Sequence, residues 1–251
     1  MKRIKNLKYM SFFLFFMILF SFNFVCNLVL IFISIKNKSP RLYIRFFFLS
    51  ILLSAWLAVL LQQLSGVDYL SSRQVSGNFL LSFWILVSFY LNKPLKLNLL
   101  TDFLNKFKDE VIKKRPKKII WMILYISLLQ LICFSPLISL NFLSGPLTLY
   151  WLDFLALALC FYGLFIYLKS RNKTESYEVR SDKLHLQYFM HPNYLGNLTF
   201  FLGLFLLSVG ATGGIWSIIG PIAMLLLMTK VIIPEHQKRV SSRVSPSENL
   251  K

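Results

Sequence analysis

Long, unbroken runs of apolar residues restrict the folds open to this chain more than any other feature of the sequence. A run of about 20 apolar residues forms a helix that can cross a bilayer, because a helix satisfies its own backbone hydrogen bonds. The strands of a membrane barrel would instead alternate apolar and polar residues, and these runs are continuous. The sequence therefore predicts an all-α, polytopic transmembrane helical bundle of about seven spans.

The predicted spans are residues 10–35, 46–61, 79–91, 119–140, 147–168, 192–209 and 215–233. The third run is short, so a six-span bundle in which residues 79–91 form a re-entrant segment is an open alternative. Pro136 should kink the fourth span, and Gly220 with Pro221 should bend the seventh. GATGG, which precedes the seventh span, should form a tight turn.

The formal net charge of +18 would suggest a nucleic-acid partner in a soluble protein. Here the Lys and Arg residues lie in loops beside apolar runs, as the positive-inside rule and anionic lipid headgroups favour. We therefore predict the lipid bilayer as a partner and no nucleic acid. In the seven-span arrangement the basic loops share a side with the C-terminus, which predicts a multi-pass membrane protein with a cytoplasmic C-terminus. The basic N-terminus argues for six spans instead.

Four regions follow from this pattern. Residues 1–92 hold the first three spans, and residues 119–240 form a second membrane domain. Between them, residues 93–118 carry apolar side chains at helical spacing with Lys and Asp in between, which predicts an amphipathic cytoplasmic helix. It either lies flat on lipid or closes over a ligand pocket. Residues 241–251 form a polar, basic tail that we expect to be disordered.

The segment HLQYFMHPNYLGNLTF, residues 185–200, separates a basic stretch from the last apolar runs. Pro192 suits the first position of a helix, with His191 as the N-cap. Asn193, Tyr194 and Asn197 then fall on the first turns of a membrane helix, at its water boundary. Unpaired N–H groups at a helix start favour a phosphate or carboxylate. The alternative is a capped helix with interfacial Tyr and Asn.

Other polar residues in or near the spans give weaker indications. Asp68 and Asp153 lie near the predicted outer ends, as interfacial or functional carboxylates. Gln130 lies mid-span, where it either bonds a neighbouring helix or contacts a substrate. The three histidines share no ligand spacing with a carboxylate or cysteine, so no metal site is predicted. The three cysteines read as small buried hydrophobic residues.

HPNYLG, followed by a span and by GGIWSIIGPIAMLLLMTKVIIPEHQKR, resembles the C-terminal half of the steroid 5-alpha-reductase-like membrane enzymes, in particular their bacterial branch of unknown function. That superfamily also includes isoprenylcysteine carboxyl methyltransferases and sterol reductases. The resemblance covers about residues 119–240 and implies the bacterial inner membrane as the location. SGVDYLSS and YISLLQLICFSPL, at residues 65–72 and 125–137, are weaker matches.

The resemblance implies a membrane oxidoreductase in which NADPH reduces a carbon–carbon double bond of a lipid or steroid-like substrate. An S-adenosylmethionine-dependent methyltransferase is the alternative on the same scaffold. By position, the resemblance assigns Asp68 and Tyr194 to catalysis, and the following residues to cofactor binding: His191, Asn193, Tyr194, Gly196, Asn197, Arg180 and Glu235. Gly196 would permit close backbone approach.

Two positions depart from the family pattern. The family usually has a basic residue where this chain has Met190, and Glu or Asp where it has Asn197. The loss of a charged pair beside the motif leaves a third alternative, a degenerate member without enzymatic activity. The sequence does not predict an oligomeric state.

Overall fold

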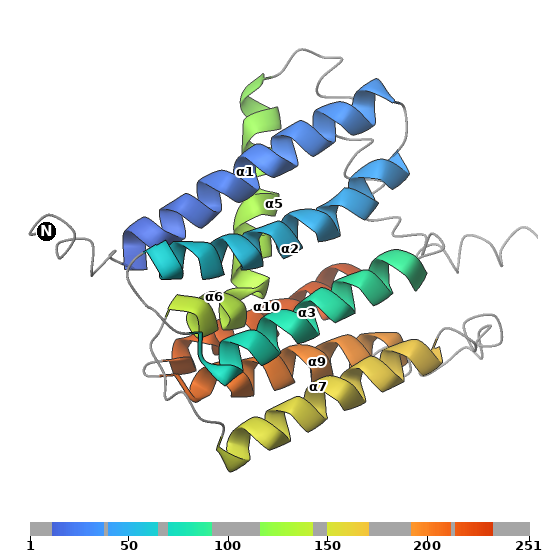
Figure 1. The fold of residues 1–251 in the computed structure, drawn as a ribbon. Helices are drawn as coiled ribbons and strands as arrows, with labels where there is room; N and C mark the ends of the chain where they lie inside the picture. Colours follow the sequence, from blue (N-terminus) through green and yellow to red (C-terminus); the bar gives the residue numbers. More distant parts are fainter. Residues whose placement is uncertain are drawn as a thin grey trace, which may run out of the picture.

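The computed structural model describes residues 12–37, 40–64, 70–91, 116–142, 150–170, 192–211 and 214–232. Every regular element within these ranges is helical, which confirms the all-α prediction (Figure 1). The elements are α1 Phe12–Lys36, α2 Pro40–Leu64, α3 Ser72–Leu91, α5 Pro116–Cys133, α6 Ser135–Phe142, α7 Trp151–Ser170, α9 Pro192–Val209, the 3-10 helix η3 Gly214–Ile218, α10 Ile219–Leu227 and the π-helix η4 Met228–Ile232.

Two helix pairs frame the bundle. Helices α1 and α2 pack side by side, and so do α7 and α9, with α3 between the two pairs in Figure 1. Helix α5 crosses behind α1 and α2 at a steep angle and contacts α1 and α10. The short helix α6 packs against α2, α3 and α9, so it joins the two halves of the bundle.

The helices suit a membrane by length and composition. Helices α1 and α7 are long and apolar enough to cross a bilayer, and α5 with α6 makes a third span if the bent pair counts as one. Shorter apolar helices occupy Leu49–Leu64, Tyr194–Val209 and Gly214–Lys230. Large apolar side chains such as Phe13, Trp121 and Phe161 point outward, where lipid would cover them. The choice between six and seven spans stays a prediction.

Helix α3 begins at Ser72, seven residues before the predicted start of the third span. The backbone N–H of Gln74 donates to Ser71 Oγ at 3.3 Å, and the Ser71 N–H donates to Gln74 Oε1 at 2.8 Å. This reciprocal capping box starts the helix within a stretch that the hydropathy pattern assigned to a loop. The prediction was wrong here because the polar side chains of the first turns find partners inside the bundle.

The fourth span is broken near the predicted proline. Helix α5 ends at Cys133 and α6 starts at Ser135, with an angle of 62° between them. Pro136 occupies the first turn of α6, where its missing N–H leaves no helical hydrogen bond unmade. The location of the kink is confirmed, but the feature is a break between two helices. Helix α5 also starts earlier than predicted, at Pro116.

The last predicted span is not one continuous helix. It is divided into η3, α10 and η4, and the change from 3-10 to α-helix comes directly before Gly220 and Pro221. A Cβ on Gly220 would lie 2.7 Å from Pro136 Cδ, so the glycine permits close packing of α10 on α6. The tight turn after α9 is closed by hydrogen bonds from Ala211 N to Ser208 O and from Gly214 N to Ala211 O.

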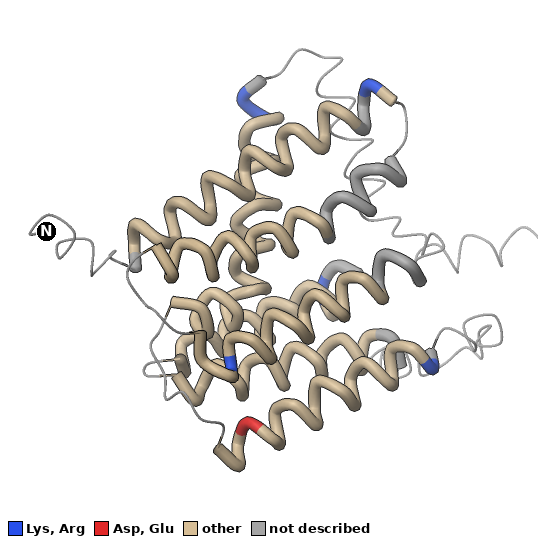
Figure 2. Tube along the Cα trace, in the orientation of Figure 1, with Lys and Arg blue, Asp and Glu red and all other residues tan. Residues whose placement is uncertain are grey.

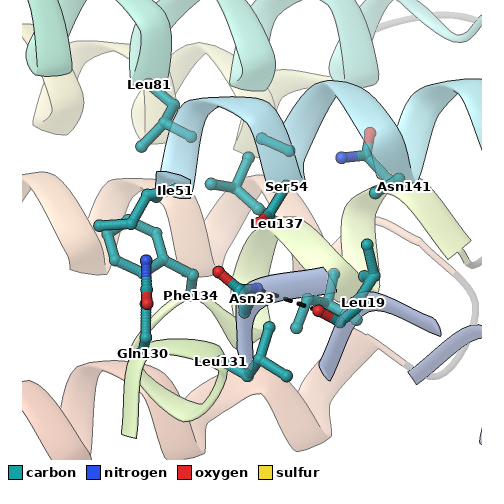
Figure 3. Close-up of a pocket in the computed structure, with 13 residues that line it drawn as sticks. Leu19, Asn23, Ile51, Ser54, Leu81, Gln130, Leu131, Phe134, Leu137 and Asn141 are labelled. Carbon is teal, nitrogen blue, oxygen red and sulfur yellow. Dashed lines mark hydrogen bonds between the residues drawn. The ribbon is translucent and has the colours of Figure 1, made fainter. Parts of the chain in front are cut away.

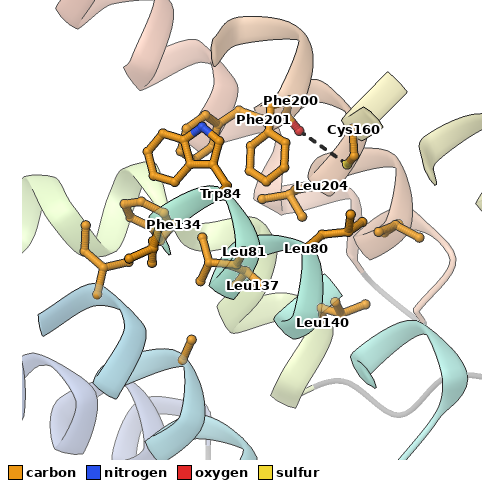
Figure 4. Packing of buried hydrophobic residues seen from close by; sticks show 14 of the residues in the cluster. Leu80, Leu81, Trp84, Phe134, Leu137, Leu140, Cys160, Phe200, Phe201 and Leu204 are labelled. Atoms are coloured by element: carbon orange, nitrogen blue, oxygen red, sulfur yellow. Dashed lines mark hydrogen bonds between the residues drawn. The ribbon is translucent and has the colours of Figure 1, made fainter. Parts of the chain in front are cut away.

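An aromatic cluster occupies the core between α3, α9 and the α5–α6 break (Figure 4). The ring of Trp84 stacks on Phe200 with centroids 5.6 Å apart and meets Phe201 edge-on. Phe134, the residue at the break, packs edge-on against Phe201 at 5.2 Å. These contacts hold α9 against α3 and against the break between α5 and α6.

Charged residues of the described chain gather at the helix ends (Figure 2). Lys36 ends α1, Lys117 and Lys118 begin α5, and Lys169 lies in the last turn of α7. Arg73 and Asp153 instead lie in the first turns of α3 and α7, at the other end of the bundle. This division agrees with a positive-inside pattern, and which end faces the cytoplasm stays a prediction.

Candidate functional site

Helix α9 has the predicted bounds. It begins at Pro192, so Asn193 and Tyr194 lie in its first turn, and Tyr194 is half-buried. Its last residue is Val209, again as predicted. The following residues with predicted roles lie outside the described residues: Asp68, Arg180, Met190, His191 and Glu235. Their roles stay predictions.

Gly196 lies where α9 touches α7. A Cβ on Gly196 would come within 2.7 Å of Tyr167 N, and one on Gly163 within 2.6 Å of Phe200 N. Gly203 makes a third such approach, to Cys160 and Ala156. Small residues of this kind let membrane helices bring their backbones into contact. Packing on α7 therefore accounts for Gly196, and its predicted role toward a cofactor is untested.

The same contacts define how the two helices run. Gly196, near the start of α9, meets the last turns of α7, while Gly203 meets its first half. The pair is therefore antiparallel, and the end of α7 that carries Lys169 lies beside the first turn of α9.

Asn197 faces the core. Its Oδ1 accepts a hydrogen bond from Trp84 Nε1 at 3.2 Å, which connects α9 to α3. A neutral amide can take this indole N–H without placing a charge among Trp84, Phe200 and Phe201, where an uncompensated carboxylate would be costly. Sequence reasoning missed Trp84, since nothing in its apolar run distinguishes it from a core residue.

An ion pair lies at the opposite end of the bundle. Arg73 Nε is 2.8 Å from each carboxylate oxygen of Asp153, and both side chains are buried, at 3% and 0% exposure. Arg73 also donates to the carbonyl of Gly210, and Asp153 accepts the backbone N–H of Tyr150 at 2.7 Å. Asp153 thus has a structural partner, so the pair joins α3, α7 and the end of α9.

Tyr194 and the ion pair lie far apart along α9. Tyr194 lies at the start of α9, and Gly210, one residue past its end, lies beside Arg73. An 18-residue helix is about 27 Å long. Tyr194 and the ion pair therefore lie at opposite ends of the bundle.

Neutral polar side chains connect the helices between these ends. Asn27 Nδ2 donates to Ser127 Oγ and to Gln130 Oε1, each at 3.0 Å. Gln130 Nε2 in turn donates to Ser50 Oγ at 2.9 Å. The helix–helix alternative for Gln130 is confirmed. Asn27 was missed, although an Asn inside an apolar run is itself a signal of a buried partner.

A second cluster of polar side chains joins α2, α3 and α6. Gln74 Nε2 donates to Gln62 Oε1 at 2.6 Å and to the carbonyl of Leu140 at 3.2 Å. Asn78 and Asn141 exchange hydrogen bonds between their side-chain amides, at 2.7 and 3.2 Å. The two clusters of polar side chains lie on either side of a small cavity among α1, α2, α3, α5 and α6.

The family comparison matches this chain over residues 50–249, with the model described as a protein of unknown function, DUF1295. The chain belongs to the DUF1295 family. No curated protein and no solved structure matches it. In this DUF1295 protein the matched region includes Trp84, Asn197 and the ion pair, while α1 precedes it. Membership agrees with a membrane-associated protein and leaves the reaction open.

Proposed function

We propose that this DUF1295 protein is an integral membrane reductase that uses NADPH to reduce a carbon–carbon double bond in a lipid or steroid-like substrate. The resemblance of the HPNYLG segment to steroid 5-alpha-reductase-like enzymes motivates the proposal. The observation that carries it is the start of α9 at Pro192, since the motif then leads into the N-terminus of a helix that packs against α7 and α6. The position of Arg180 in the basic stretch of sequence before the motif adds to this proposal.

The chemistry at this helix start suits a phosphate-bearing cofactor. The N–H groups of the first turn have no intrahelical partner, and the helix dipole places partial positive charge there. Lys169, in the adjacent last turn of α7, is exposed and adds a full positive charge. Together these groups would favour the phosphates of NADPH.

Reduction of a polarised double bond requires a hydride at one carbon and a proton at the other. Bound NADPH would supply the hydride and leave as NADP. Tyr194, half-buried in the first turn of α9, is our candidate proton donor: its O–H would protonate the second carbon and regain a proton from water. Apolar helix surfaces would admit a lipid-like substrate from the side.

Ligand-dependent thermal stability tests the proposal. The purified protein in detergent would be unfolded with NADPH, NADP, S-adenosylmethionine or S-adenosylhomocysteine. A ligand at about 100 times its dissociation constant stabilises a protein by ~2.7 kcal/mol. We expect NADPH and NADP alone to raise the midpoint, and His191→Ala to abolish that effect. His185→Ala is the matched control, because it removes a histidine outside the HPNYLG motif.

Charge neutralisation separates the two cofactor classes. S-adenosylmethionine carries no phosphate, so replacing Arg171, Arg180 and Lys183 together by Gln should impair NADPH binding and spare the methyl donor. A shift with S-adenosylmethionine alone would replace the reductase proposal by the methyltransferase alternative. Folded protein that responds to no ligand would favour a degenerate member, with Met190 and Asn197 as the reason.

A further inference from the structure

The cavity among α1, α2, α3, α5 and α6 is shown in Figure 3 and has a volume of about 20 Å³, which is room for one water-sized group. The described residues that line it are all buried. Asn23 lies at the middle of α1 and Ser54 near the middle of α2, so the cavity lies deep within the bundle. None of the described lining residues carries a charged side chain.

One lining atom lacks a partner within the described part of the chain. Asn23 is 1% exposed, and its Nδ2 donates to the carbonyl of Leu19 at 3.2 Å, but its Oδ1 accepts no hydrogen bond from any described residue. The Leu19 carbonyl can only accept a hydrogen bond. If the Asn23 amide were turned by 180°, its oxygen would face the Leu19 oxygen, and two acceptors would meet without a donor. The orientation of the amide is therefore determined, and Oδ1 points among the lining residues (Figure 3).

The neighbouring polar groups do not satisfy this atom. Ser54 Oγ donates its proton to the carbonyl of Ser50 at 2.8 Å, so only its acceptor lone pairs remain. The amides of Gln130 and Asn141 also line the cavity, and they donate to Ser50 Oγ and to Asn78 Oδ1. The unpaired oxygen of Asn23 therefore needs a donor from outside these groups. An unpaired buried acceptor destabilises a protein, and a hydrogen-bond donor placed in the cavity would remove that cost.

We propose that this cavity binds one neutral hydroxyl group, which donates a hydrogen bond to Asn23 Oδ1. The remaining walls, which include Ala58, Leu81 and Leu137, are apolar, and because the cavity has room for the hydroxyl alone, the carbon chain of an alcohol would have to pass between them. Water and a membrane alcohol offer the same donor and differ in that chain. The inference concerns the cavity alone and does not depend on the reductase activity.

A matched pair of probes distinguishes the two sources. The full chain in detergent would be titrated with 1-octanol and, separately, with octyl methyl ether, which has no O–H. A rise of the unfolding midpoint with the alcohol relative to the ether supports a membrane alcohol. The rise should vanish in Asn23→Leu, which removes the acceptor, and in Ala58→Val, which keeps Asn23 and fills the cavity.

Water leaves a different signature. No alcohol-specific shift, together with an ordered water within hydrogen-bond distance of Asn23 Oδ1 in an experimental map, assigns the site to water and upholds the proposal. No alcohol-specific shift and no water, with a higher unfolding midpoint for Asn23→Leu than for the natural chain, would overturn it. In that case the amide oxygen is unpaired in an empty cavity, and an apolar side chain is preferred there.

Discussion

Neutralising Asp153 should destabilise the protein strongly. Asp153→Asn keeps the shape of the side chain but removes the charge that faces Arg73, whose Nε lies 2.8 Å from both carboxylate oxygens. Both groups are almost fully buried, so solvent cannot replace the lost interaction. Breaking a buried ion pair from one side typically costs about 3–5 kcal/mol, because the remaining charge is left uncompensated.

The expected loss of stability can be expressed as a shift of the thermal unfolding midpoint. For chains of this length, 1 kcal/mol corresponds to roughly 2–4 °C, so Asp153→Asn should lower the unfolding midpoint by about 6–20 °C. Intrinsic tryptophan fluorescence during heating in detergent provides the assay. Lys36→Met is the matched control: Lys36 is exposed at the end of α1, and we expect a change within about 0.5 kcal/mol.

A double variant tests whether the two charges depend on each other. Arg73→Met with Asp153→Leu removes both charges, and apolar replacement of a buried pair is often neutral or stabilising. The double variant should therefore be more stable than either single variant. A small effect of Asp153→Asn, or a double variant as unstable as the sum of the two single ones, would show that the charges are not coupled as described.

Three further predictions use the same unfolding assay. Gly163→Ala places a Cβ against the backbone of α9 and should cost about 1–3 kcal/mol, whereas Ala158→Leu enlarges an exposed position of α7 and should change little; equal effects would argue against close helix contact. Ser71→Ala removes the N-cap of α3 and should cost ~1 kcal/mol; no change would mean that the capping box is not formed. Asn141→Leu removes the donor to Asn78 Oδ1, while Asn78 Nδ2 keeps its bond to the Gln74 carbonyl, and should cost about 1–3 kcal/mol; adding Asn78→Leu should recover part of the loss; no recovery would refute the pairing.

The sequence was a good guide wherever the signal is local. Apolar runs predicted the helical class, and Pro192 predicted the first residue of α9. Pro136 marked the break between α5 and α6, although the proline could not tell a kinked helix from two helices at 62°. A missing N–H and a restricted φ act on the proline's own turn, so their consequences can be read without a fold.

The sequence was a poor guide where polar residues begin a helix. Residues 72–78 of α3 looked like loop because they include Arg73, Gln74 and Asn78. All three are buried in the structure, and each has a partner on another helix. A hydropathy pattern counts each such residue as exposed, since it cannot see a partner that lies far away in the chain.

The candidate site also has some features that the sequence predicted and others that it did not. The motif and the helix that carries it were predictable, but the contacts of Gly196 with α7 and of Asn197 with Trp84 were not. The unpaired oxygen of Asn23 was equally hidden, because its lack of a partner among the described residues depends on where the packed helices place the neighbouring polar groups.

By itself, the sequence determined that this protein is built from apolar helices, and it located the ends of α9, because hydropathy and proline geometry act within a few residues. Only the tertiary structure decided which polar groups meet. Arg73 and Asp153 are 80 residues apart in the chain, and Asn27 and Gln130 are 103 apart. Inside an apolar bundle each of these groups must find a partner, and which partner it finds depends on how the helices pack.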